Sequence, residues 1–296
     1  MTDERINLLG RRESLLARLR NIAKEVPGVD PTRRLQLTLA MDRFLARLLE
    51  TTPWGSWVLK GGYANQLRAP LEARFTQDVD LKIDAPLSEA HHILRIAAAV
   101  DLDDLFSYEL VGESQQLDGP PGGGLRFRIR ANLAGIEFAQ FGADINSKDA
   151  VIGELERHRS DPFVVKLGFA SSEFPVYPRA QQFAEKLHAY TRPRSMENTR
   201  AKDLADMIWF IERYTFSTDD LIDSAVATFG RRSSHPWPPI IPNPPASWAQ
   251  PYTALRNELK IDPATTEAAK DVLLAFLEPV LAEQRGIVTQ PIKPRN

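Results

Sequence analysis

The sequence predicts an α+β protein in which a mixed β-sheet core follows two N-terminal helices and precedes a helical C-terminal region. Three observations support this fold class. Apolar residues recur at helical spacing over 6–26 and 31–50, short segments typical of strands occupy the region from 57 to about 175, and helical spacing returns beyond Pro178. We therefore expect two domains, 1–175 with the N-terminal helices and the α/β core and 176–296 as a helical lobe.

The composition is that of a globular protein without cysteine chemistry. Of 296 residues, 43% are hydrophobic and 26% are charged, which provides enough apolar chain to bury a core. The chain contains no cysteine, which excludes disulfides, cysteine-based zinc sites and cysteine nucleophiles. The N-terminus lacks an apolar signal-peptide core, and no stretch approaches the roughly 18 apolar residues of a membrane span. We expect a cytoplasmic protein with no membrane partner.

The net charge does not by itself identify a partner. Lysine and arginine number 37 and aspartate and glutamate 39, which gives −2. A near-neutral protein can still bind nucleic acid through a local basic face. Basic residues that could contact phosphates gather in the C-terminal half, at Arg192, Arg194, Arg200, Lys202, Arg231 and Arg232, although each could equally lie on an ordinary solvated helix face.

The two N-terminal helices are expected to be scaffold. In the second, the apolar residues that would line one face are Leu37, Met41, Phe44, Leu45 and Leu48. Pro31 suits the first turn of that helix, and Asp30 suits the capping position before it.

The middle region alternates strands and short helices. Strands are expected at 57–59, 78–83, 125–131, 136–145 and 163–169, and helices at 64–68 and 87–100. Ala134 and Gly135 would form the turn between two of these strands. Beyond Pro178, helices are expected at 180–190, 201–214, 218–229 and 264–282, and a proline-dense stretch begins at His235.

A glycine pair follows the first predicted strand directly. Gly61 and Gly62 permit positive φ and close approach of the backbone to a ligand. The N-terminus of a following helix offers unpaired N–H groups, which bind phosphate well. This turn is therefore a candidate site for a phosphate chain.

Two aspartates lie on the next predicted strand. Asp78 and Asp80 are two residues apart, so their side chains point to the same face. Adjacent carboxylates repel each other unless a cation bridges them, and hard oxygen ligands suit Mg²⁺. Asp144, at the end of another strand, could be a third ligand or a general base. An Asp-x-Asp pair alone is common on solvated strand edges, and it is the combination with the glycine turn that favours the metal-site interpretation.

These motifs resemble a known family. The segments 61–64, Gly-Gly-Tyr-Ala, and 74–81, Arg-Phe-Thr-Gln-Asp-Val-Asp-Leu, are similar to the first motif of the AbiEii-type nucleotidyltransferase toxins. This family belongs to the polymerase-β-like nucleotidyltransferase superfamily and includes the MenT toxins of mycobacteria. Residues 144–147 resemble its third-carboxylate strand, 182–189 its lysine motif, and 200–206 its basic-x-basic-Asp-Leu-x-Asp motif.

The resemblance implies a nucleotidyltransferase-type core, an active site that the helical lobe 176–296 completes, and a set of site residues. The implied catalytic residues are Asp78, Asp80, Asp144, Lys186 and Asp203. The implied nucleotide-binding residues are Gly61, Gly62, Tyr63, Arg74, Thr76 and Lys186. Asp78, Asp80 and Asp144 would bind Mg²⁺ or Mn²⁺, and an NTP would be the co-substrate. Tyr63 departs from the pattern, because many superfamily members carry Ser or Thr there.

Three residues of the C-terminal helices illustrate the alternatives. Lys186 is expected on the same helix as Phe183, and a lysine on an amphipathic helix ordinarily lies on the surface. A lysine can also neutralise the charge on departing pyrophosphate. Asp203 and Asp206 share one helix face. The resemblance favours Asp203 as the functional acid, and we expect Asp206 on the helix surface, paired with Lys202.

The resemblance implies transfer of a nucleoside monophosphate from an NTP to the 3′ end of tRNA, which blocks translation. It also implies a toxin–antitoxin pair and hence a cognate antitoxin as partner. Two alternatives keep the same fold. One is a transferase that modifies a small molecule or a protein hydroxyl, and the other is an inert nucleotide-binding protein.

Overall fold

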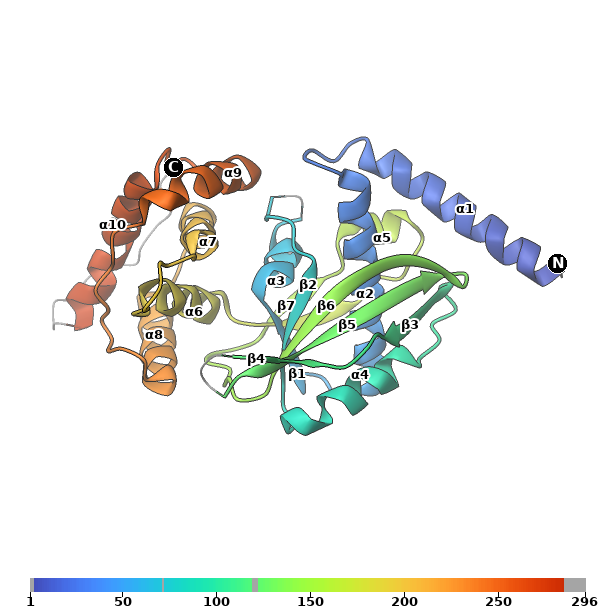
Figure 1. Cartoon of the computed structure of the whole chain (residues 1–296), viewed down its shortest axis with the longest axis horizontal. Helices are drawn as coiled ribbons and strands as arrows, with labels where there is room; N and C mark the ends of the chain where they lie inside the picture. Colours follow the sequence, from blue (N-terminus) through green and yellow to red (C-terminus); the bar gives the residue numbers. More distant parts are fainter. Residues whose placement is uncertain (1–2, 71, 119–121, 285–296) are drawn as a thin grey trace. The chain divides into compact units, whose positions relative to one another are not determined.

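The computed structural model describes residues 3–70, 72–118 and 122–284. The chain divides into two compact units (Figure 1). The first comprises 1–149 and 155–176, and the second 150–154 and 177–296. Each unit has its own buried apolar residues, and each is described by itself below.

An eight-stranded mixed sheet forms the centre of the first unit. Its strands are β1 (Trp57–Lys60), β2 (Asp78–Ile83), β3 (Phe106–Leu110), β4 (Gln115–Leu117), β5 (Gly124–Leu133), β6 (Ile136–Asn146), β7 (Glu156–Arg159) and β8 (Glu173–Val176). The spatial order is β3-β5-β6-β2-β1-β8-β7, and β4 pairs with β5. Strand β2 runs antiparallel to β1 and parallel to β6, so the predicted α+β class with a mixed sheet is confirmed.

Five helices accompany this sheet in the described part of the chain: α1 (Asp3–Ala23), α2 (Pro31–Thr51), α3 (Gly61–Arg68), α4 (Ala90–Ala98) and α5 (Pro162–Lys166). As expected, Pro31 occupies the first turn of α2, and the Asp30 carboxylate accepts a hydrogen bond from the N–H of Arg33 at 3.1 Å. Helix α2 packs against β6 and α4, which places it behind the sheet in the view of Figure 1.

Strand periodicity separates the two faces of the sheet. On β2, Val79 and Leu81 are fully buried in the core that includes α2, whereas Asp78 and Asp80 are only partly buried. Successive side chains of a strand point to opposite faces. One face is therefore the hydrophobic core, and the other presents the polar side chains of the central strands.

The hairpin between β5 and β6 forms where the sequence predicts it. Ala134 and Gly135 have φ of 53° and 76°, which is the left-handed conformation that a tight hairpin turn requires. The two strands pair over their whole length, with one irregularity in register between Ala131 and Asn132. This hairpin carries Asp144 to its place beside β2.

The second unit is helical within its described residues. It contains α6 (Arg179–Thr191), α7 (Ala201–Arg213), α8 (Thr218–Arg232), α9 (Ala249–Leu259) and α10 (Thr266–Gln284). Helix α7 contacts α6, α9 and α10. Phe183, Phe216 and Phe276 form an aromatic cluster with ring centroids 5.2 to 5.7 Å apart, and such pairs contribute beyond the area that they bury.

Two local predictions need correction. Residues 163–169 do not form a strand, because Pro162 begins helix α5 and the Asp161 carboxylate caps it by accepting from the N–H of Phe163. Helix α3 begins at Gly61 rather than at Ala64, so the glycine pair forms its first turn. Elements that the sequence analysis did not identify are β3, β4, β7, β8 and α9.

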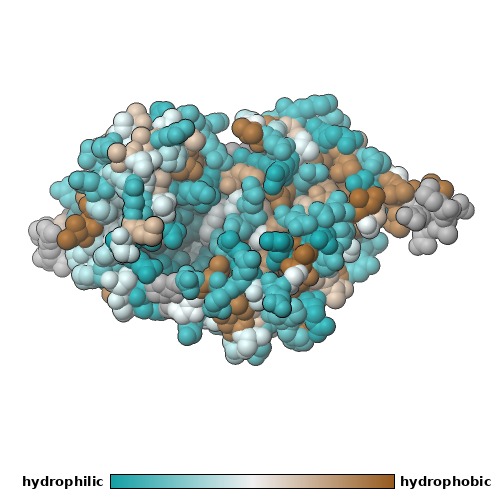
Figure 2. Space-filling view, viewed as in Figure 1, coloured by the Kyte–Doolittle hydropathy of each residue, from teal (hydrophilic) through white to brown (hydrophobic). Residues whose placement is uncertain are grey.

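The surface agrees with the composition. Hydrophilic side chains cover most of the face visible in Figure 2, with hydrophobic residues scattered among them. Within the described residues, no helix is both long and apolar enough to cross a membrane.

Candidate active site

Three aspartates come together on the polar face of the first unit. Parallel pairing of β2 with β6 sets Asp80 directly beside Asp144 and Asp78 beside Gly142. Since Asp78 and Asp80 are two residues apart on one strand, all three carboxylates lie on the same face. The strand register thus produces the juxtaposition that the sequence predicts.

Gly61 fits closely against Asp80. Its φ is 69°, and a Cβ at this position would overlap the Asp80 carboxylate. Only glycine combines this backbone conformation with so close an approach. The first turn of α3 is therefore held against the acidic residues, and its N-terminal N–H groups belong to the same site.

Thr76 positions the other carboxylate. Its buried hydroxyl donates a hydrogen bond to Oδ1 of Asp78 at 2.6 Å. A Cβ on Gly62 would come within 2.9 Å of the Thr76 side chain, so the second glycine allows this contact. Thr76 was predicted to bind the nucleotide, whereas its hydroxyl proton is engaged with Asp78.

The predicted residues Tyr63 and Arg74 differ in their exposure. The Tyr63 side chain is completely buried, and its hydroxyl donates to the carbonyl of Thr38 at 3.3 Å. The side chain therefore does not face a ligand site, and the backbone N–H of Tyr63 is the group left for the predicted nucleotide contact. Arg74 is partly buried in the loop before β2, and its carbonyl accepts a hydrogen bond from Gln66.

Arg126 is a member of this site that the sequence analysis did not single out. Its guanidinium donates two hydrogen bonds to Asp144, both at 2.6 Å, and lies 3.7 Å from Asp78. A two-point arginine–carboxylate contact is the strongest geometry for such a pair. The usable signal was the alternation of Arg126, Arg128 and Arg130 along a predicted strand, which places all three on the face of the aspartates.

Lys186 lies on α6 in the second unit and forms a buried ion pair. Its Nζ is 2.6 Å from Asp206 and 3.7 Å from Asp203. Asp206 is 1% exposed, so the expectation that it lies on the helix surface beside Lys202 is wrong. The face shared by Asp203 and Asp206 points inward towards α6, because α6 and α7 pack together.

Several of the basic residues considered as phosphate contacts are engaged within the second unit. Arg232 pairs with Glu185 at 3.2 Å, Arg200 lies 3.7 Å from Asp203, and Arg194 donates to the Ala189 carbonyl. Nearby His188 is buried, and burial first, then the charge of Arg232, lowers its pKa to about 3. It is neutral at physiological pH and hydrogen-bonds with Ser234.

Comparison with known proteins decides the family. The model of the family described as "Nucleotidyl transferase AbiEii toxin, Type IV TA system" matches residues 43–284. The chain belongs to this family. As an AbiEii nucleotidyltransferase toxin, it uses an NTP as substrate and has an antitoxin partner.

A solved structure shows the same fold. MenT4, a nucleotidyltransferase toxin from Mycobacterium tuberculosis H37Rv, is similar with a TM-score of 0.53 and 18% sequence identity, over 87% of this chain and 94% of that one. No curated protein matches the chain. The AbiEii fold thus extends through both units, because the family match begins within α2 and runs to the end of α10.

The three aspartates of this AbiEii protein fit a divalent cation by donor chemistry. All of their donor atoms are carboxylate oxygens, the ligands that Mg²⁺ and Mn²⁺ prefer, and they share one sheet face. Arg126 holds both oxygens of Asp144 in the arrangement described. Consistent with this, no three acidic, histidine or cysteine side chains among the described residues are gathered as a complete ligand set. Asp78, Asp80 and Asp144 are therefore the residues that would hold a divalent cation.

Proposed function

We propose that this AbiEii protein transfers a nucleoside monophosphate from an NTP to the 3′ end of tRNA and thereby blocks translation until its antitoxin acts. One observation carries the proposal: the glycine turn of α3 lies against Asp80, and Asp80 lies beside Asp144 on the next strand. A phosphate-binding helix N-terminus and a carboxylate cluster thus meet at one place, as nucleotidyl transfer requires.

Each residue has a defined part in the proposed reaction. Asp78, Asp80 and Asp144 would hold one or two Mg²⁺ or Mn²⁺ ions, and a bound cation would neutralise the phosphates and lower the pKa of the attacking hydroxyl. The backbone N–H groups of Gly61, Gly62 and Tyr63, with Arg74, hold the triphosphate. Thr76 keeps the Asp78 carboxylate in its orientation through the hydrogen bond described above.

We propose a lysine for charge compensation. Lys186 neutralises the negative charge that develops on the departing pyrophosphate. Asp206 fixes the lysine side chain through its 2.6 Å contact, and Asp203 lies at a longer distance. We therefore propose Asp206 and Asp203 as residues that position Lys186, and Asp206 has the closer contact.

Radiolabelled NTPs test the proposal directly. The full chain is incubated with each labelled NTP in three separate reactions, which contain total tRNA, bacterial protein extract or buffer alone. Each reaction is run once with Mg²⁺ and once with EDTA. We expect label in tRNA only, and only with the metal present. Label in protein would show a protein hydroxyl as acceptor, and a new labelled small molecule would show a small-molecule acceptor. No label in any fraction with any NTP would overturn the transferase proposal.

A further inference from the structure

Three arginines alternate along β5 on the same face as the aspartates, and their surroundings differ. Arg126 is held by Asp144, as described above. Arg130 is held by Glu109 at 3.0 Å and by Glu137 at 3.1 Å. Arg128, between them, is exposed and has no carboxylate within ion-pair distance among the described residues. One cation of the row is therefore not neutralised.

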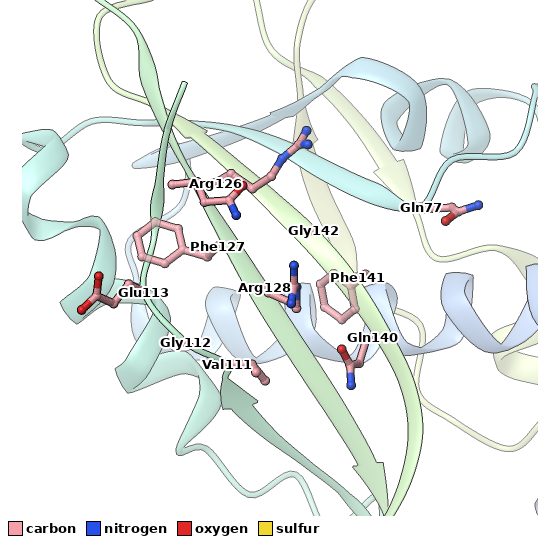
Figure 3. A pocket seen from close by; sticks show the side chains of 11 residues that line it. Gln77, Val111, Gly112, Glu113, Arg126, Phe127, Arg128, Gln140, Phe141 and Gly142 are labelled. Atoms are coloured by element: carbon pink, nitrogen blue, oxygen red, sulfur yellow. The ribbon is translucent and has the colours of Figure 1, made fainter. Parts of the chain in front are cut away.

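Arg128 lines a polar pocket of about 420 Å³ on this face (Figure 3). Gln77 and Gln140 contribute side-chain amides to its wall, and Gly142, opposite Arg128 on β6, adds no side chain there. Glu113 and Gln115 line it from the segment before β5. The pocket thus offers one available guanidinium, several amide donors and acceptors, and a carboxylate at its far side.

The strand register fixes where this pocket lies relative to the reactive centre. Arg128 pairs with Gly142, and Gly142 pairs with Asp78, which sets Arg128 about 10 Å from Asp78, two strand spacings away. The glycine turn of α3 lies on the opposite side of the aspartates, because the strand order is β5-β6-β2-β1 and α3 follows β1. The aspartates therefore separate the glycine turn from the pocket.

We propose that this pocket is the acceptor subsite and binds the sugar-phosphate backbone of a single-stranded RNA end beside its reacting 3′ hydroxyl. This rests on the proposed nucleotidyl transfer to RNA. In an in-line displacement the attacking and leaving oxygens lie on opposite sides of the phosphorus. With the triphosphate at the glycine turn, the acceptor approaches from the side of the pocket.

The chemistry of the lining assigns the contacts. The planar guanidinium of Arg128 matches the two free oxygens of a phosphodiester. Glu113 would repel a second phosphate, so it is suited to accept a hydrogen bond from a ribose hydroxyl. The amides of Gln77 and Gln140 can meet the edge of a base without restricting its identity strongly. The subsite thus selects RNA over DNA mainly through Glu113.

The test compares two arginines of the same strand. R128Q removes the available cation, whereas R130Q removes a cation that Glu109 and Glu137 already neutralise, and so serves as the matched control. The full chain of each variant is titrated against a short fluorescein-labelled single-stranded RNA, and steady-state transfer is measured with varied tRNA and varied NTP. We expect R128Q to raise the Kd for RNA and the KM for tRNA about tenfold, the loss of one charge-assisted contact, with the KM for NTP unchanged.

Further readouts separate a contact from a structural effect. R128Q should lower the slope of log affinity against log salt by about 0.7, the value for one phosphate contact on a single strand. R130Q should change the Kd for RNA less than about twofold. R128K should recover part of the RNA affinity that R128Q loses. E113Q should reduce the preference for RNA over a DNA of the same sequence. Melting temperatures should match across the set.

The outcomes distinguish the two proposals. If the wild-type chain labels no tRNA, the proposed function fails. If the wild type labels tRNA but R128Q binds and labels it normally, the acceptor subsite is wrong and the proposed function stands. If R128Q raises the KM for NTP instead, the pocket holds the nucleotide donor and the assignment is overturned.

Discussion

Nζ of Lys186 lies 2.6 Å from Oδ2 of Asp206, and both side chains are almost completely buried. The pair joins α6 to α7 in the middle of the second unit. Burial of two charges costs several kcal/mol in desolvation, which their attraction only partly recovers. Apolar side chains at these two positions would avoid this desolvation cost. The presence of the buried pair therefore supports the proposed role of Lys186 in nucleotidyl transfer.

A double-mutant cycle separates the stability of this pair from its function. K186M and D206N should each lower the free energy of unfolding by about 3 kcal/mol, because each removes one partner of a buried charge pair. The double variant should recover much of this loss, since neither charge then remains. Transfer of NTP label to RNA should be severely reduced in all three. Recovery of transfer in the double variant would show that the pair serves the fold alone.

Removal of either β2 carboxylate should stop transfer without harming the fold. We expect D78N and D80N to lower transfer at least about a hundredfold, because each loses a proposed cation ligand. Their melting temperatures should be equal to or slightly above that of the wild type, since adjacent carboxylates repel each other. D84N, just beyond the same strand and largely exposed, is the matched control and should transfer normally. Full transfer by D80N would contradict the proposed site.

The close approach of Gly61 to Asp80 predicts a position-specific glycine effect. G61A would strain a backbone with φ of 69° and push the Asp80 carboxylate aside, so transfer should fall about a hundredfold or more. Gly135 has φ of 76° and nothing within 4 Å of an added Cβ. G135A should therefore show the strain alone, about 1 kcal/mol of stability, with transfer unchanged. If G61A and G135A transferred label equally well, displacement of the Asp80 carboxylate would not affect transfer, and the proposed role of Asp80 would be wrong.

A buried carboxyl in the first unit should make stability depend on pH. Burial raises the pKa of Asp42 from 3.8 to about 7, although the Ser160 hydroxyl and Arg43 act against this. A raised folded-state pKa means that the folded protein binds the proton more tightly. The Asp42 contribution to the free energy of unfolding is thus largest at low pH and falls by up to about 4 kcal/mol between pH 3.8 and about 7.

D42N should remove this dependence. Its free energy of unfolding, measured in urea, should rise relative to that of the wild type between pH 3.8 and about 7, where the wild type loses stability. Asp104 gives a control of opposite sign, because the hydrogen bonds and charges of Arg47 and Arg43 outweigh its burial and lower its pKa. D104N should be less stable than the wild type at neutral pH and should approach it in acid. A pH-independent difference between D42N and the wild type would contradict the assignment.

Sequence patterns predicted the structure correctly where that structure depends on residues close together in the chain. The hairpin turn at Ala134 and Gly135, the Asp30 cap and the strand that carries Asp78 and Asp80 all formed as predicted. Turn chemistry, capping and strand alternation act over a few residues and are therefore visible in the chain itself. The same local chemistry was overlooked at Pro162, where Asp161 and the proline start a helix.

Residue type and short spacing are enough to give the α+β class, the position of the Asp pair after the glycine turn and the family motifs. The partners of these residues depend instead on how the chain packs in three dimensions. The register of β2, β6 and β5 set Asp144 beside Asp80 and brought Arg126 to Asp144, and the packing of α7 on α6 buried Asp206 against Lys186. Such contacts join residues 18 to 64 positions apart, and which of many possible pairs form is decided by the burial of apolar faces across the whole unit rather than by any local pattern.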